Sequence, residues 1–198
     1  MIVALAEAVA RLARGELVAY PTETVYGLGA DPGQPAALAR LLAAKGRDAE
    51  RGLSLLVADA AALARFAPGL PPAAARLAAR FWPGPLTLVV PVAAGAFPGV
   101  ATPLGVGFRC SPQPTAAALA AAARHPVVST SCNRSGEPPA ANRAEVEAAF
   151  GSELPVLGGE PAGGLAPSTV VAVGAAGGLE LLRAGAIALE ALEKAARA

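Results

Sequence analysis

Polar side chains that can bind anions recur along this chain at the points where apolar runs end. Arginine forks match carboxylate and phosphate groups, lysine supplies a compact positive charge, and hydroxyls and amides donate neutral hydrogen bonds that fix orientation. Such groups suffice for phosphoryl or nucleotidyl transfer, because positioning and charge stabilisation supply most of that catalysis. The clusters are Thr22 with Thr24, Lys45 with Arg47, Arg109, Ser129 with Ser131 and Asn133, Ser168 with Thr169, and Arg183. By themselves these residues indicate a binder of an anionic ligand such as a nucleotide.

The stretch from Pro21 to Gly29 carries two threonines, a glutamate and a tyrosine directly after the apolar run 17–20. Proline has no N–H to give to a sheet, so we expect the strand to stop at Pro21, and Gly27 and Gly29 to let the backbone turn. Ligands of α/β proteins usually bind beyond the carboxyl ends of strands, which makes this loop a candidate site. A plain connecting turn explains the same residues equally well.

Several familiar kinds of site are absent from the sequence. It contains no G-x-x-x-x-G-K-[ST] phosphate loop and no G-x-G-x-x-G, and its one histidine, His125, excludes a multi-histidine metal site. Cys110 and Cys132 are too few for a disulfide framework and lack metal-ligand spacing, so we expect reduced thiols without a catalytic role. The net charge of +1 argues against a broad basic surface for nonspecific nucleic-acid binding.

Length and hydropathy favour one globular domain without membrane association. The chain has 198 residues, 54% of them hydrophobic, but aromatic residues are few, so the core must be built mainly from Leu, Val and Ala. Gly, Pro or Arg interrupts every apolar stretch before it reaches the roughly 18 residues that a membrane span needs. The N-terminus lacks the basic segment and apolar core of an export signal, so we expect a cytoplasmic location.

Hydrophobic periodicity and the turn residues predict strands that alternate with helices. Such alternation favours an α/β fold, and closely spaced strands near 86–110 and 169–183 indicate some antiparallel pairing, giving a twisted mixed sheet flanked by helices, with a concave face. Asp59 is expected to cap one helix, and the glycine-rich segment 158–166 is a candidate mobile loop. The helices are expected at 2–14, 35–44, 60–66, 72–82, 114–124, 143–150 and 188–197, and the strands at 17–20, 53–57, 86–92, 106–110, 126–131, around 171 and at 179–183.

Six motifs, taken in order, resemble the short, single-domain YrdC-type threonylcarbamoyl-AMP synthases. Any one of them is weak evidence, but the match is colinear over nearly the whole chain. The resemblance implies that residues 1–198 form one YrdC-like catalytic domain. The motifs are Pro21 to Gly29, Lys45-x-Arg47, Trp82 to Thr87, Ser129 to Gly136, Pro167 to Val170, and Leu182-Arg183-x-Gly185.

The resemblance implies a nucleotidyltransferase that combines L-threonine, bicarbonate or CO2, and ATP into L-threonylcarbamoyladenylate and releases pyrophosphate. The product would serve threonylcarbamoyladenosine modification of tRNA next to the anticodon, through downstream threonylcarbamoyl-transfer proteins and with possible contact to tRNA itself. Mg2+ would accompany the ATP phosphates, without a protein metal cage.

The resemblance also assigns residues to the two pockets. It implies a catalytic set around the ATP phosphates, an additional nucleotide contact from Arg183, and a threonine pocket in which Arg109 is the natural carboxylate fork. The phosphate set is Lys45, Arg47, Ser131 and Asn133, and the threonine set is Thr22, Thr24, Arg109, Ser129 and Ser168. Three positions depart from the family pattern: Asp48 replaces a usual proline, Leu56 a histidine and Gly105 a threonine.

Two other functions fit parts of the same evidence. One is a noncatalytic module that binds tRNA or double-stranded RNA on a basic concave face, and the other is a carbamoyl-adenylate-forming enzyme of metalloenzyme maturation, which normally has additional domains. Without the resemblance, Lys45 and Arg47 would be interpreted as a solvated helix end, and Glu23 as a loop hydrogen-bonding group rather than a general base.

Overall fold

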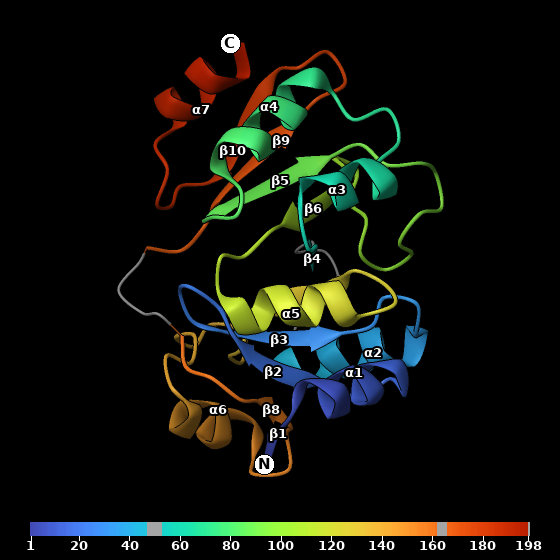
Figure 1. The fold of residues 1–198 in the computed structure, drawn as a ribbon, viewed down its shortest axis with the longest axis vertical. Helices are drawn as coiled ribbons and strands as arrows, with labels where there is room; N and C mark the ends of the chain where they lie inside the picture. Colours follow the sequence, from blue (N-terminus) through green and yellow to red (C-terminus); the bar gives the residue numbers. More distant parts are fainter. Residues whose placement is uncertain (47–52, 162–165, 198) are drawn as a thin grey trace.

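The computed structural model describes residues 1–46, 53–161 and 166–197, and within these ranges ten strands form one mixed sheet (Figure 1). The strand order is β1-β8-β2-β3-β7-β4-β6-β5-β9-β10. The strands are β1 (Ile2–Val3), β2 (Val18–Pro21), β3 (Tyr26–Ala30), β4 (Ser54–Leu56), β5 (Leu86–Val90), β6 (Val106–Arg109), β7 (Val127–Ser131), β8 (Val156–Leu157), β9 (Thr169–Val173) and β10 (Leu179–Arg183). The helices are α1 (Leu5–Ala13), α2 (Pro35–Lys45), α3 (Ala60–Phe66), α4 (Pro72–Phe81), α5 (Pro114–Ala122), α6 (Arg143–Phe150) and α7 (Leu189–Arg197).

The pairing of the strands confirms the predicted mixed α/β sheet. Strand β5 runs antiparallel to β6 and β9 antiparallel to β10, as their short spacing indicated, while β4–β6 and β5–β9 are parallel. Helices begin where the sequence provides start signals. Proline lies in the first turn of α2, α4 and α5, and the carboxylate of Asp59 accepts a hydrogen bond from the backbone N–H of Ala62 at 2.7 Å to cap α3.

Three strands were not predicted, and the predicted N-terminal helix began too early. Ile2–Val3 pairs with Val156–Leu157 in parallel, so α1 starts only at Leu5. The prediction that the chain turns at the glycines after Pro21 was also wrong, because Tyr26–Ala30 is a strand that pairs antiparallel with β2, and Pro21 itself lies within β2. The turn is therefore confined to residues 22–25.

Gly27 and Gly29 are needed for space rather than for a turn. Both lie in β3, and a methyl group on Gly27 would come within 2.7 Å of Cζ of Tyr20, while one on Gly29 would come within 3.0 Å of Cε1 of the same ring. Tyr20 is fully buried. The two glycines thus leave room for an aromatic ring that packs flat on the strand.

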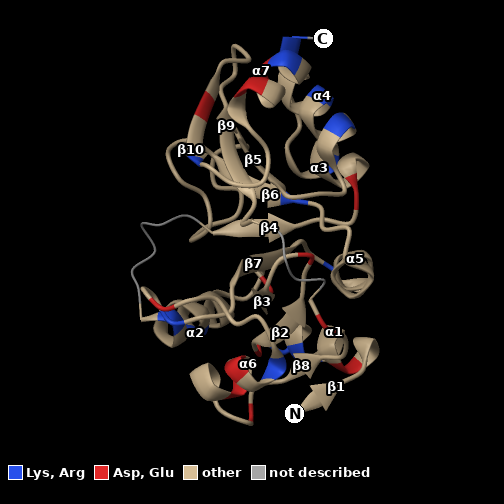
Figure 2. Ribbon diagram, turned by 90° about the vertical axis from the view of Figure 1, so that its left-hand side faces the viewer, with Lys and Arg blue, Asp and Glu red and all other residues tan. Residues whose placement is uncertain are grey.

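The buried residues form two clusters. In the smaller one, α1 and α5 pack together over β2, and Val18, Tyr20 and Leu56 from the sheet meet Leu12 and Leu119 from these helices. Figure 2 shows α2 on the other side of β2 and β3 from α1 and α5. The larger cluster includes side chains of α2, α3, α4 and α7, and burial of each Leu or Phe in it contributes about 1.5–3 kcal/mol. No helix in the described ranges has the length and apolar character needed to cross a membrane.

Candidate active site

The β2–β3 turn folds its polar side chains inward. Thr22, Glu23 and Thr24 are all buried. The Thr22 hydroxyl donates to the carbonyl of Val25 at 2.6 Å and lies 3.1 Å from the Thr24 hydroxyl, and it accepts from the backbone N–H of Thr24 at 3.2 Å. Thr22 therefore uses its hydroxyl to close the turn, which leaves Thr24 as the threonine of this pair better placed to contact a ligand.

Glu23 is paired across the sheet with Arg109. Its side chain is 4% exposed and that of Arg109 12% exposed, and one carboxylate oxygen accepts from Nη2 of Arg109. The other oxygen accepts from the hydroxyl of Ser111 at 2.5 Å. Both oxygens of Glu23 are thus engaged, so this residue holds the guanidinium in place, in agreement with its predicted role as a hydrogen-bonding group.

Arg183 brings a second guanidinium to the same place. It donates to the carbonyl of Ser168 at 2.8 Å and to the Ser168 hydroxyl at 2.8 Å, and that hydroxyl lies 3.1 Å from the hydroxyl of Thr87. Arg183 is exposed as a whole, but partial desolvation of its guanidinium, and secondarily the charge of Arg109, lower its pKa below the ordinary value. Glu23 pairs with Arg109 only, so the two nearby guanidinium groups leave a net positive charge, which an anionic ligand would neutralise.

Strand register explains why residues so distant in sequence meet. Arg109 lies opposite Leu56 on β4 and opposite Thr87 on β5, while Ser129 on β7 lies opposite Ser54. Leu56, at the position where the family resemblance expects a histidine, is buried and belongs to the cluster around Tyr20. Of the predicted threonine set, Arg109 and Ser129 therefore lie on β6 and β7, on either side of β4, while Thr22 and Thr24 lie in the β2–β3 turn and Ser168 directly precedes β9.

Lys45 forms a second polar cluster with the end of β7. It is the last residue of α2, only 2% exposed, and its Nζ donates to the carbonyl of Ser131 at 2.5 Å, the carbonyl of Asn133 at 2.9 Å and the Asn133 side-chain oxygen at 3.0 Å. The Ser131 hydroxyl donates to the same Asn133 oxygen at 2.6 Å. Interpretation of Lys45 as a solvated helix end was therefore wrong: its charge is buried and holds the β7 turn.

The remaining members of the predicted site divide into those outside the described residues and those explained by backbone geometry. Arg47 and Asp48 lie outside the described residues, as does part of the glycine-rich segment 158–166. Gly105 has φ +116°, and a methyl group there would meet the Val90 carbonyl oxygen at 2.0 Å. The threonine that the resemblance expects at position 105 could not fit this backbone.

Tyr20 and Ser111 belong to this site but were not predicted. Ser111 contacts Glu23, and Tyr20 is fully buried beneath the site with burial raising the pKa of its phenol to about 12. Within the described ranges, Oη of Tyr20 and Nε of Arg109 are the buried side-chain polar atoms without a hydrogen-bond partner. Only tertiary structure brings these residues together, so no spacing in the sequence could have identified them.

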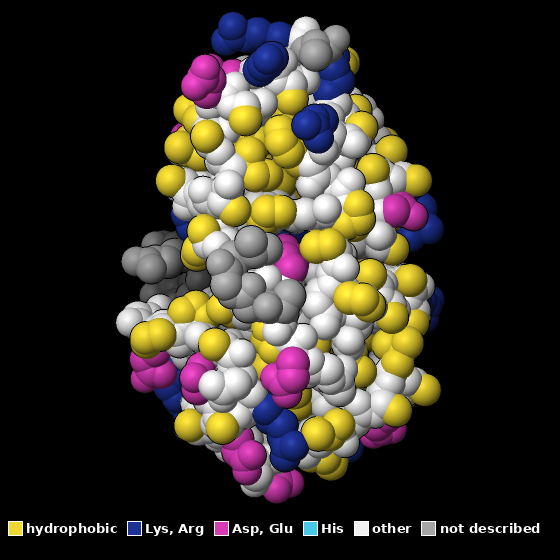
Figure 3. All heavy atoms as spheres, turned by 60° about the vertical axis from the view of Figure 1, so that its left-hand side comes forward, with side chains coloured by type: hydrophobic (Ala, Val, Ile, Leu, Met, Phe, Trp, Pro, Cys, Tyr) yellow, Lys and Arg dark blue, Asp and Glu magenta, His cyan; other side chains and the backbone are white. Residues whose placement is uncertain are grey.

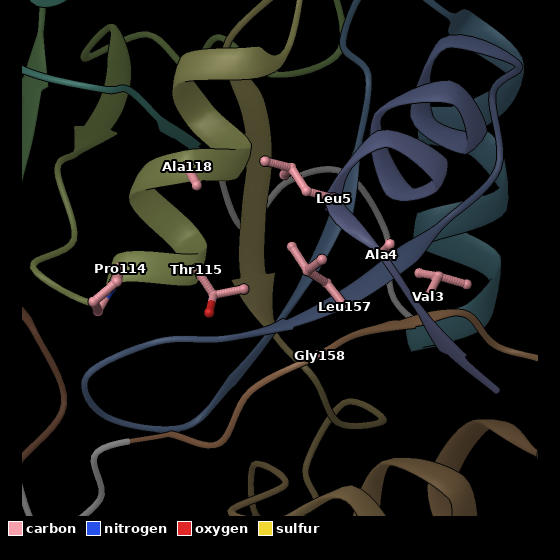
Figure 4. Close-up of a pocket in the computed structure, with 8 residues that line it drawn as sticks. All are labelled: Val3, Ala4, Leu5, Pro114, Thr115, Ala118, Leu157 and Gly158. Carbon is pink, nitrogen blue, oxygen red and sulfur yellow. The ribbon is translucent and has the colours of Figure 1, made fainter.

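One apolar hollow and the two cysteines were also considered as candidate sites, and neither has the groups that catalysis needs. A hollow of about 360 Å³ between α1, α5 and β8 is lined mainly by apolar residues, with Thr115 as its one hydroxyl-bearing side chain (Figure 4). Cys110 and Cys132 are free and buried, and burial raises their pKa values to about 11 and about 12, so both thiols stay protonated at neutral pH. The convergent polar groups, rather than this apolar hollow, mark the candidate active site.

Comparison with known proteins places the chain among tRNA-modifying enzymes and their structural relatives. The Sua5/YciO/YrdC family, described as "Telomere recombination", matches residues 10–185. The threonylcarbamoyl-AMP synthase of Chromohalobacter salexigens is 47% identical over 169 residues, which cover 84% of this chain and 90% of the relative, and that of Halorhodospira halophila is 42% identical over 86% of this chain and 90% of the relative. The structure of P. abyssi Sua5 complexed with L-threonine superposes with a TM-score of 0.86 at 34% identity, covering 98% of this chain and 60% of Sua5.

Proposed function

This chain belongs to the Sua5/YciO/YrdC family, and on that premise we propose that it is an adenylate-forming enzyme that makes threonylcarbamoyl-AMP and pyrophosphate from L-threonine, bicarbonate or CO2, and ATP. The synthases of Chromohalobacter and Halorhodospira, each matched over 90% of its length, support this function for the chain as a whole. We take residues 1–198 as a single catalytic domain.

The observation that carries the proposal is that two guanidinium groups, of Arg109 and Arg183, lie near each other while one buried carboxylate, Glu23, pairs with Arg109 alone. An amino acid brings a carboxylate of its own, and the spare hydrogen-bonding capacity of Arg109 suits that group. Thr24, Ser129 and Ser168 are the hydroxyl-bearing side chains that would orient the rest of the amino acid. The complex of P. abyssi Sua5 with L-threonine is consistent with an amino-acid pocket in this fold.

The Lys45 cluster would bind the ATP phosphates. In the proposed reaction an oxygen of the N-carboxylated threonine attacks the α-phosphorus, the bond from that phosphorus to the β-bridging oxygen breaks, and pyrophosphate leaves with the electron pair. Negative charge builds on the phosphate oxygens as this happens. In the free protein the ammonium of Lys45 and the hydroxyl of Ser131 donate to residues 131 and 133, so Lys45 would stabilise this charge through its own positive charge and Ser131 by turning its proton to the phosphate, and Arg47 is assigned to the same task.

Mg2+ is expected to arrive with ATP. Among the described residues no group of three or more His, Cys, Asp or Glu side chains is arranged to hold a metal ion; the hydroxyl oxygen of Ser131 is a neutral ligand of the kind that Mg2+ accepts, whereas the amide oxygen of Asn133 already accepts from Lys45 and Ser131. When bound with the phosphates the ion would neutralise charge on them. The chain's own part is to hold these oxygens beside Lys45.

A noncatalytic RNA-binding module is less well supported. The net charge is +1, and on the face drawn in Figure 3 the lysine and arginine side chains form separate groups with hydrophobic and acidic side chains between them. RNA binding through phosphates requires a continuous basic surface. We therefore propose that tRNA and the threonylcarbamoyl-transfer proteins of the cytoplasm act after adenylate formation, and that any direct tRNA contact is secondary.

The test is to incubate the purified chain with ATP, Mg2+, bicarbonate and individual amino acids and to follow pyrophosphate and the adenylate by mass spectrometry. We expect adenylate formation that requires both threonine and bicarbonate. Binding of tRNA that weakens steeply with salt, in a protein that releases no threonine-dependent pyrophosphate, would favour the RNA-binding module instead.

A further inference from the structure

Tyr20 carries a hydroxyl group that the free protein does not pair in good hydrogen-bond geometry. The residue is fully buried on β2, yet no described residue lies within hydrogen-bond geometry of its Oη, and its one side-chain contact of this kind, with Ser129, falls short of that geometry. Tyr26, equally buried on the neighbouring strand, donates its hydroxyl to the carbonyl of Gly159 at 2.8 Å. Because buried polar groups are nearly always hydrogen-bonded, an unpaired phenol beside a binding site requires an explanation.

Ser129 is the side chain nearest to a hydrogen-bond partner for Tyr20. Burial raises the pKa of the phenol, which therefore keeps its proton, while a side-chain hydrogen-bond contact with Ser129 acts in the opposite direction. Arg109 and Glu23 influence that pKa through their charges. Arg109 has only donors to offer, and each oxygen of Glu23 already accepts one hydrogen bond, from Arg109 or from Ser111. The hydroxyl oxygen of Ser129 is therefore the acceptor we consider for the phenol.

Ser129 is placed to connect the phenol with a ligand. It lies on β7 opposite Gly29, one of the two glycines against which the Tyr20 ring packs, and its backbone carbonyl is fixed by the Ser54 hydroxyl at 2.6 Å. Ser129 is 8% exposed, whereas Tyr20 is not exposed at all. Within the described ranges, its hydroxyl contacts the Tyr20 phenol outside ordinary hydrogen-bond geometry, so its proton can still turn toward a ligand.

We propose that Tyr20 is a positioning residue for amino-acid binding, which donates its hydroxyl proton to Oγ of Ser129 when Ser129 turns its own proton toward the bound amino acid. This inference rests on the proposed function and deepens it. When the Ser129 oxygen accepts a hydrogen bond from the Tyr20 phenol, the single proton of Ser129 remains available to donate to the bound amino acid. The phenol thus selects the donor orientation of Ser129 without touching the ligand itself.

The experiment compares Tyr20→Phe with the matched control Tyr26→Phe. Removal of an unpaired hydroxyl loses no hydrogen bond in the free protein, so Tyr20→Phe should leave the melting temperature unchanged or slightly raised, while Tyr26→Phe should lower it. For threonine binding, Tyr20→Phe should be the variant with the larger effect. It should raise the KM for threonine about fivefold with the KM for ATP unchanged. Tyr26→Phe should leave threonine binding near the wild-type value.

A double-mutant cycle shows whether Tyr20 acts through Ser129. In a Ser129→Ala background, Tyr20→Phe should have no further effect on the threonine KM. The proposal is overturned if Tyr20→Phe leaves threonine binding intact, if its effect is the same with and without Ser129, or if it destabilises the free protein as much as Tyr26→Phe does. A wild-type chain that binds no threonine by calorimetry would instead contradict the proposed function, so the two failures are distinguishable.

Discussion

The two polar clusters of the candidate active site differ in how many of their hydrogen-bonding groups already have partners within the protein. Around Lys45, the ammonium group donates to three oxygens of residues 131 and 133, and the Ser131 hydroxyl joins the same network. Around Arg109, Glu23 pairs with this guanidinium alone while Arg183, held by Ser168, adds a second positive charge, and a guanidinium N–H and a phenol have no partner within hydrogen-bond geometry in the described ranges. The first cluster is therefore built into the fold, whereas the second retains hydrogen-bonding capacity for a ligand.

Lys45→Ala should have the largest effect, because it removes a structural and a catalytic charge together. We expect adenylate formation to fall about 10²–10³-fold, by analogy with the loss of one stabilising donor, and the free energy of unfolding to fall by about 3 kcal/mol as buried acceptors lose their donor. Pyrophosphate release and thermal unfolding measure the two effects. The matched control is Lys194→Ala, an exposed residue of α7, which should change neither adenylate formation nor stability. Full stability in Lys45→Ala would contradict the structural half of this comparison.

Arg109→Lys should affect threonine and spare ATP. Lysine keeps a positive charge beside Glu23 but loses the planar fork, so we expect the KM for threonine to rise roughly 10–100-fold, the equivalent of one charge-assisted hydrogen bond. Steady-state kinetics with each substrate varied in turn give the two values. Arg65→Lys, on the exposed surface of α3, serves as the control. An equal rise in the KM for ATP would show that the two clusters are not separate.

Thr22 and Thr24 offer a smaller, paired test within one turn. Thr22→Val should lower the free energy of unfolding by about 1 kcal/mol, because its hydroxyl closes the turn, and should change the threonine KM less than twofold. Thr24→Val should do the opposite and raise the threonine KM about fivefold with little change in stability. Chemical denaturation and kinetics on both variants decide between them. If the effects were exchanged, the ligand contact would belong to Thr22.

The smallest expected effects concern the two thiols, and they are seen in thiol reactivity and in the pH dependence of stability. Burial raises their pKa values from the ordinary 9.0 to about 11 for Cys110 and about 12 for Cys132, so at pH 8 native protein should react with iodoacetamide at least about tenfold more slowly than protein in urea. Because folding favours the protonated thiols, their contribution to stability is present below pH 9 and is lost as pH rises toward 11–12. Mass spectrometry and unfolding at several pH values test this, and rapid native labelling would contradict it.

Local signals in the sequence predicted most of the fold. The proline starts of α2 and α4, the Asp59 cap and the apolar runs of β5 and β6 all indicated elements that the structure contains. Strands β1 and β8 escaped prediction because two residues show no periodicity. Strand β3 was not predicted because its glycines were interpreted by their usual role in turns, whereas here they leave space for the Tyr20 ring on the neighbouring strand.

The site was predictable only as a set of residue types. The motifs identified Lys45, Ser129 and Ser168, and the family resemblance added Arg109, but the partners that define their roles come from tertiary structure. Glu23 and Arg109, for example, are 86 positions apart and meet because the β2–β3 turn folds over β6. The burial of Lys45 likewise depends on β7, which lies far along the chain. Assignment of these residues to ATP or to threonine stays a prediction until the variants are measured.

The packing of Tyr20 on Gly27 makes these two positions in the chain dependent on each other. No residue larger than glycine can enter position 27 while a ring lies 2.7 Å from the site of its first carbon, and the three atoms nearest that site all belong to Tyr20. If position 20 held a small residue, alanine at 27 would fill the vacated volume, whereas a methyl group at 29 would still come within 3.0 Å of Cγ1 of Val127. Among related sequences we therefore expect positions 20 and 27 to covary, with loss of the ring and gain of a methyl group on β3 occurring together, while position 29 keeps its glycine.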